Sequence, residues 1–190
     1  MREKAQNLLY SDNFIKLILI LGFFILVLIS LIIMRTPAAT GYEISIYEAY
    51  PIYFWMLIIS SIFIGELVLL RYALNYNGSN LWVGGALLIV ISNIILLFQP
   101  IIRGYAIYGR GDVLTHIGYI KDMLVSGTIG SNPYPLDHIF FISLNLTSLF
   151  NLSDLVILIP VIFSMFFMLS MFLLARTVFE SNEKVIFVLI

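Results

Sequence analysis

The chain of 190 residues is 61% hydrophobic and 15% aromatic, and only 11% of its residues are charged. Soluble domains are about 45–50% apolar, so this composition indicates an integral membrane protein whose main partner is the lipid bilayer. A formal net charge of −1 provides no basic field for nucleic acid, and the absence of cysteine excludes disulfides, thiolate metal sites and cysteine nucleophiles.

Four segments are long and apolar enough to cross a membrane. About 30 Å of hydrocarbon takes roughly 20 apolar residues in a helix, because backbone polar groups in lipid must be satisfied within the segment. In chain order, these segments are Phe14 to Met34, Pro51 to Leu70, Leu81 to Ile102 and Leu155 to Phe179. The sequence therefore predicts an all-α polytopic membrane protein with four transmembrane helices.

Three shorter segments complete the expected architecture. Val113 to Val125 repeats apolar residues at helical spacing beside a polar face, which predicts an amphipathic helix at the membrane interface, ended by Gly127. Ile139 to Phe150 is too short to cross and is expected to form a membrane-embedded half-helix. Val185 to Ile190 is interpreted as the start of a further, truncated span.

The order of these segments suggests two units and an orientation. We expect a transmembrane hairpin over residues 1–78, and a second unit over residues 79–190 made of a span, an outer loop, the half-helix, a span and the start of the next. The distribution of Lys and Arg favours a cytoplasmic N-terminus, and the plasma membrane is the expected location. On this topology, residues 103–154 are extracytoplasmic.

The polar stretch from Arg103 to His138 is the candidate site, because it contains both histidines of a chain with few charges. Residues three and four apart are neighbours on a helix, so Asp112, His116 and Tyr119 share one face. Asp112 is also explained as a helix N-cap, which does not exclude a catalytic role.

The same stretch contains candidate metal ligands. His138 follows Asp137 directly, and the two form either a hydrogen-bonded pair that closes a loop or part of a site. The cofactor is left unknown, and a divalent cation is the candidate because oxygen and nitrogen ligands are at hand. The possible ligands, which no recognised spacing unites, are Asp112, His116, Asp137 and His138.

Two carboxylates, Glu43 and Glu48, lie among tyrosines in the first outer loop. One interpretation is a loop of solvated acids with an aromatic belt. The other is a second carboxylate cluster that meets the Asp112 loop across the same face of the membrane.

Several motifs follow one another in a specific order. Gly111-Asp-Val-Leu-Thr-His116 opens the interfacial helix, Gly127 ends it, and Tyr134-Pro-Leu136 leads into the next apolar helix. This order resembles GT-C-type integral membrane glycosyltransferases. Gly41-Tyr-Glu43 and the segment from Tyr47 to Pro51 are similar to segments of uncharacterised archaeal multi-pass proteins of this type, and the resemblance covers essentially the whole chain.

The resemblance implies transfer of a sugar from a polyprenyl-phosphate donor to an extracytoplasmic acceptor. Asp112 matches the loop carboxylate of the family, whose implied role is general base or metal ligand, and His116 would orient Asp112, contact the donor phosphate or share a cation with it. The candidate donor- or acceptor-binding residues are Arg110, Tyr119, Tyr134, His138, Glu43 and Glu48.

Two departures from the family bear on this assignment. The family's loop usually follows the first span, whereas a helical hairpin precedes it here, and members run to several hundred residues. We therefore expect the N-terminal portion of such an enzyme, with a downstream chain completing the fold. The alternative is a non-enzymatic multi-pass membrane protein, such as a degenerate fragment, an assembly partner or a transporter subunit.

Overall fold

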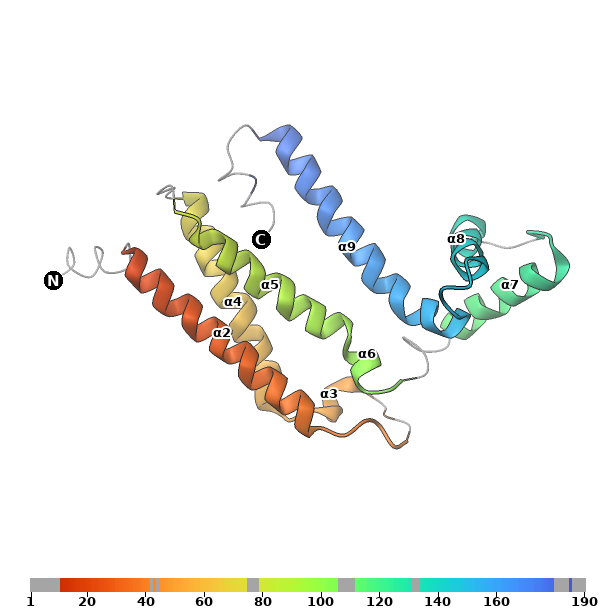
Figure 1. Cartoon of the computed structure of the whole chain (residues 1–190), viewed down its shortest axis with the longest axis horizontal. Coiled ribbons are helices and arrows are strands. Elements are labelled where there is room, and N and C mark those ends of the chain that lie inside the picture. The colour runs from red at the N-terminus through yellow and green to blue at the C-terminus, as the bar shows by residue number, and fades with distance from the viewer. Residues whose placement is uncertain are drawn as a thin grey trace.

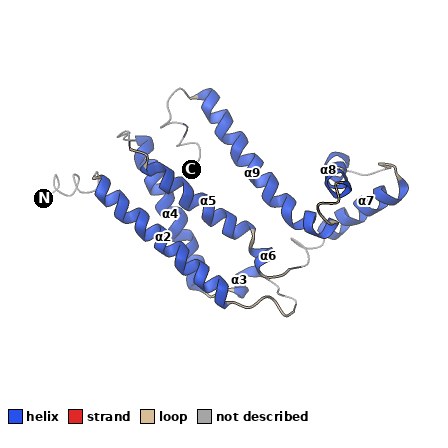
Figure 2. Ribbon diagram, viewed as in Figure 1, coloured by secondary structure: helices blue, strands red, loops and turns tan. Residues whose placement is uncertain are grey.

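A computed structural model describes residues 11–41, 43, 45–74, 79–105, 112–130, 134–179 and 185. Figures 1 and 2 show that the regular elements in this part of the chain are helices, without a strand, which confirms the all-α class. The helices are α2 (Asp12–Arg35), α3 (Ile46–Ala49), α4 (Ile52–Leu74), α5 (Leu81–Leu97), α6 (Gln99–Ile102), α7 (Asp112–Ser126), α8 (Pro135–Leu146) and α9 (Leu152–Val178).

Three of these helices are long and apolar enough to cross a membrane. They are α2, α4 and α9, with 24, 23 and 27 residues. At a rise of about 1.5 Å per residue, each exceeds the roughly 30 Å of a hydrocarbon core. They agree with three of the four predicted spans, and each extends a few residues beyond at least one predicted end.

The prediction of a fourth long span over Leu81 to Ile102 is not confirmed. α5 ends at Leu97 after 17 residues, and the four-residue α6 follows it. Pro100 has no N–H to donate to the carbonyl of Leu96, and its ring crowds that carbonyl. The helix therefore breaks ahead of Pro100, which leaves α5 at the short end of the crossing range.

α2, α4 and α5 pack together as a three-helix bundle (Figure 1). Each helix contributes to the buried core, where Ile29 of α2, Phe54 of α4 and Leu88 of α5 are fully buried. Because lipid tails are as apolar as these side chains, contacts between the side chains stabilise the bundle through van der Waals packing and not through removal from water. α5 is thus a packed part of the bundle although it is short.

Small residues bring α4 and α5 into close approach. A Cβ atom on Gly65 would lie 2.7 Å from the backbone oxygen of Gly85. On the same pair of helices, the buried hydroxyl of Ser92 donates a hydrogen bond to Ser61 Oγ at 3.1 Å. Small and hydroxyl-bearing residues are typical of helix contacts in membranes, because they allow backbones to approach and satisfy polar groups inside the contact.

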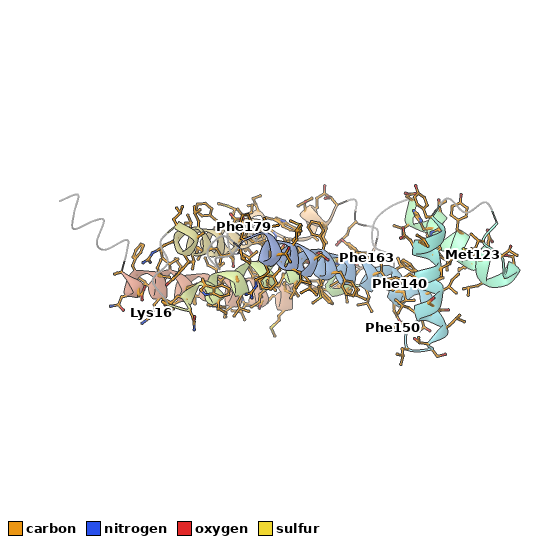
Figure 3. The ribbon with its side chains drawn as sticks, turned by 90° about the horizontal axis from the view of Figure 1, so that it is seen from above. Lys16, Met123, Phe140, Phe150, Phe163 and Phe179 are labelled. Carbon is orange, nitrogen blue, oxygen red and sulfur yellow. The ribbon has the colours of Figure 1, made fainter. Side chains whose placement is uncertain are left out.

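α7, α8 and α9 form the second part of the fold. Figure 1 places α7 and α8 beside the first turns of α9 and away from the three-helix bundle, and in Figure 3 α8 runs across the direction of α9. The ring of Phe140 on α8 lies 5.8 Å from that of Phe163 on α9. Both side chains are labelled in Figure 3. This contact anchors α8 on α9.

The two short helices largely match their predicted ranges. α7 corresponds to the predicted helix over Val113 to Val125, and Gly127 ends it with a φ of +67° and a hydrogen bond from its N–H to the Met123 carbonyl. α8 is shifted from the predicted range of Ile139 to Phe150. It begins at Pro135, because a proline in its first turn suits a helix start, and it ends at Leu146. Placement of α7 at the interface and of α8 within the membrane stays a prediction.

Two further predictions fall on other parts of the chain. The unit boundary at residue 78 lies within residues 75–78, outside the described residues. The truncated span over Val185 to Ile190 also lies outside them, except for Val185, which is buried.

We expect Gly65→Ala to destabilise the contact between α4 and α5. The new methyl group would meet the Gly85 oxygen at 2.7 Å, and a backbone atom moves only if the helices separate. Overpacking of this kind costs about 1–3 kcal/mol, so thermal unfolding in detergent should begin at a lower temperature. Gly118→Ala on α7 is the matched control, because nothing lies within 4 Å of its Cβ position. Equal destabilisation by both variants would contradict the close-contact argument.

Candidate functional site

Side chains from α7 and from the start of α8 meet in one cluster, here called the histidine cluster. Its members are Asp112, His116, Tyr119, Tyr134 and His138. Nδ1 of His116 lies 2.8 Å from Nε2 of His138, and Nε2 of His116 lies 3.6 Å from a carboxylate oxygen of Asp112. The structure thus brings together the two residues predicted as catalytic and three of the residues predicted to bind donor or acceptor.

The spacing of α7 explains one half of this arrangement. Asp112 and His116 are four residues apart and therefore lie one above the other on the helix. The carboxylate of Asp112 is 85% exposed, whereas His116 and Tyr119 are half-buried against α8. Of these three residues, Asp112 is therefore the one most open to a reactant.

Aromatic rings surround the two imidazoles. The ring of Tyr134 lies 5.0 Å from that of His116, and the ring of Tyr119 is stacked 5.9 Å from that of His138. His138 itself is 1% exposed. This packing restricts the orientation of both imidazole rings.

Burial favours the neutral form of one histidine of the pair. It lowers the pKa of His138 below the ordinary value, and the charge of His116 adds to this effect, while Asp137 acts in the opposite direction. His138 is therefore neutral near pH 7. A neutral imidazole has one donor and one acceptor nitrogen, so Nε2 of His138 can share a single hydrogen with Nδ1 of His116.

The four residues predicted as possible metal ligands are not gathered into one group. Among the described residues, no group of three or more His, Cys, Asp and Glu side chains is arranged to hold a metal ion. His116 and His138 turn ring nitrogens toward each other, and Asp112 lies beside the other nitrogen of His116. Asp137 is exposed. Both ring nitrogens of His116 thus face partners inside the histidine cluster.

A second polar group, here called the Arg103 network, lies at the end of the three-helix bundle. The guanidinium of Arg103 donates hydrogen bonds to both carboxylate oxygens of Glu43 and to the carbonyl of Pro37, and the hydroxyl of Tyr105 also donates to Glu43. The N–H of Ala39 donates to the Arg103 carbonyl at 2.9 Å. Arg103 is 5% exposed. The carboxylate of Glu43 therefore neutralises a charge that is buried inside the protein.

The Arg103 network gives Glu43 a role that differs from both sequence interpretations, which were a solvated acid in a loop and a member of a second carboxylate cluster. Hydrogen bonds from Arg103 and then from Tyr105 hold the pKa of the Glu43 carboxyl below its ordinary value, so Glu43 is an ionised structural partner. Glu48 is exposed on α3, and Figure 1 sets α3 and α6 apart from α7 and α8. The predicted second carboxylate cluster is therefore separate from the histidine cluster.

Sequence reasoning missed the partnership of Arg103 and Tyr105 with Glu43. These residues are about 60 positions from Glu43, and the only cue was that Arg103 opens the polar stretch. Arg110, predicted to bind donor phosphate, lies in residues 106–111, outside the described residues.

The chain matches no protein-family model, no curated protein and no solved structure.

We expect Glu43→Gln to lower the stability of the bundle end, because it leaves the buried Arg103 guanidinium without a counter-charge. One-sided loss of a buried ion pair costs about 3–5 kcal/mol, and the partial exposure of Glu43 reduces the expected loss to about 2 kcal/mol. Thermal unfolding in detergent would measure it. Glu48→Gln, an exposed neighbour in the same loop, should change stability by less than about 0.5 kcal/mol. Equal effects of the two variants would show that Glu43 is not a structural partner.

We expect acid to loosen the contact between α7 and α8. Because folding lowers the pKa of His138, the stability from its neutral form is complete above about pH 6.5 and is lost as the pH falls below that value. Hydrogen exchange of α8, corrected for intrinsic pH dependence and compared with α4, should rise between pH 7.5 and pH 5. In His138→Gln this pH dependence should disappear. A rise that persists in the variant would assign the effect to another group.

Proposed function

We propose that this chain belongs to a GT-C-type membrane glycosyltransferase that moves a sugar from a polyprenyl-phosphate donor to an extracytoplasmic acceptor. The observation that carries the proposal is the exposed Asp112 carboxylate beside the His116–His138 pair. A general base must reach the proton that it accepts, and the carboxylate of Asp112, which is 85% exposed, is open to a bulky lipid-linked substrate.

The arrangement of the helices supports a reaction at one membrane face. α2 and α5 run in one direction, and α4 and α9 run in the other, so the loop before α4 and the segment before α9 lie at the same end (Figure 1). α7 and α8 lie near this end, beside the first turns of α9. We place the N-terminus on the cytoplasmic side of the plasma membrane. On this topology, the end that holds α7 and α8 is extracytoplasmic.

The proposed step is an inverting displacement. The oxygen of an acceptor hydroxyl forms a bond to the anomeric carbon of the sugar, and the bond from that carbon to the phosphate oxygen breaks. Its electron pair leaves with the polyprenyl phosphate, and the hydroxyl proton passes to Asp112. His116 orients Asp112, and the neutral His138 holds the ring of His116 through the 2.8 Å contact. A positioned base of this kind contributes about 10²- to 10⁴-fold in rate.

One observation favours the non-enzymatic alternative. Asp112 lies in the first turn of α7, where a carboxylate stabilises the positive end of a helix dipole without any chemistry. In that case, the histidine cluster only packs α7 on α8, and the chain serves as an assembly or transport partner. The two functions make opposite predictions in a transfer assay.

We expect Asp112→Asn to abolish transfer of labelled sugar from polyprenyl-phosphate donors in membranes that contain the protein, by at least about 100-fold, because the amide cannot accept the proton. Asp122→Asn is the matched control, since Asp122 is an exposed carboxylate on the same helix. Gel filtration in detergent should show both variants folded. Unchanged transfer in Asp112→Asn, or equal loss in both variants, would contradict the assignment of Asp112 as the base.

A further inference from the structure

A groove lies between the end of α2 and the start of α4, separate from both polar clusters. Its volume is about 510 Å³, within the range of about 300–1,000 Å³ that is common for small-molecule sites. Its lining includes Leu28, Leu31, Ile32, Arg35, Tyr53 and Leu57. The groove belongs to the two helices that are long enough to cross the membrane.

The lining changes from apolar to charged along the groove. Leu28, Leu31 and Arg35 follow one another at helical spacing and form one stripe on α2. At about 1.5 Å per residue, the stripe runs for about 10 Å. It begins inside the apolar helix and ends with a cation in the last turn. A membrane lipid has the same order of groups, from acyl chain to phosphate.

The charge of Arg35 is not used by the ion pairs of the described residues. Those pairs join Arg71 to Asp12 and Arg103 to Glu43. Glu43, in the loop that follows α2, is already bound by Arg103 and Tyr105. Arg35 is exposed at the groove, so its guanidinium can neutralise a ligand's negative charge.

Two further features favour a phosphate at this end. α4 begins at Ile52 beside the groove, and the first turn of a helix carries the positive end of its dipole. Tyr53 is 55% exposed, and a tyrosine at a membrane interface pairs an apolar ring with a polar hydroxyl. Guanidinium binds phosphate through charge-assisted hydrogen bonds.

We propose that this groove binds one anionic phospholipid of the bilayer. The phosphate lies on Arg35, and an acyl chain follows the wall of Leu28, Leu31 and Leu57. An anionic lipid is favoured over a zwitterionic one, because a choline head group would place a second cation near Arg35. The site is formed by α2, α4 and their flanking residues Thr36 and Pro51, and it is independent of the proposed sugar transfer.

Native mass spectrometry of the whole chain in detergent tests this site. Phosphatidylglycerol and phosphatidylcholine with the same acyl chains are titrated against the protein. One phosphatidylglycerol should be retained in preference to phosphatidylcholine, and an equal molar amount of inorganic phosphate should not displace it, since the acyl chain contributes to binding. Absence of that preference, or displacement by free phosphate, would overturn the proposal.

Three variants test the residues of the groove. Arg35→Gln should weaken phosphatidylglycerol binding about tenfold, as expected for loss of one charge-assisted hydrogen-bonding group. Leu31→Trp, which fills the groove from an exposed position, should weaken both lipids. Arg176→Gln is the control, because Arg176 is the corresponding cation in the last turn of α9. Unchanged binding in Arg35→Gln and Leu31→Trp, or equal loss in Arg176→Gln, would overturn the site.

Discussion

One end of the three-helix bundle depends on the ion pair between the buried guanidinium of Arg103 and the carboxylate of Glu43. A charge removed from water is costly unless it is paired and hydrogen-bonded, so Glu43 and the Pro37 carbonyl must lie where Arg103 can reach them. The hydrogen bond from Ala39 to the Arg103 carbonyl adds a backbone link to the same place. The loop after α2 is thereby held against the turn after α6.

The two polar clusters differ in how completely they are satisfied. In the Arg103 network, the guanidinium donors are taken up by oxygens of the same chain, and Arg103 is nearly inaccessible. In the histidine cluster, the imidazoles pair with each other, but the carboxylate of Asp112 remains open to solvent. A closed network stabilises a fold, whereas a rigid group with one open end can act on a second molecule. This contrast is why the proposed chemistry is assigned to α7 and α8.

The membrane explains the rest of the surface. Large apolar side chains are exposed along α2, α4 and α9, among them Leu17, Phe63 and Phe167. Their exposure to lipid costs no free energy, because lipid tails are as apolar as the side chains. Backbone groups in lipid have no water to bond with, so the long segments must be helical. The groove beside Arg35 is a place where this lipid-facing surface is hollowed and also charged.

The sequence by itself determined the helical class, three of the spans and the range of α7, because hydropathy and the helical period are local properties. It also predicted that Gly127 ends α7, since a positive φ is a property of a single residue. Pro100 is also a local signal, since a proline interrupts a helix. The prediction of a fourth long span followed the apolar composition of Leu81 to Ile102 and did not take this signal into account.

Only the tertiary structure decided which polar groups meet. Glu43 pairs with Arg103 across 60 positions, and His116 meets His138 across 22. The approach of Gly65 to Gly85 likewise depends on how α4 crosses α5. The physical reason is that hydropathy and helical period act along the chain, whereas each of these contacts depends on the relative placement of two separate segments. A helix face read from the sequence can list the groups of a site, but packing decides which of them are buried together and which remains exposed to react.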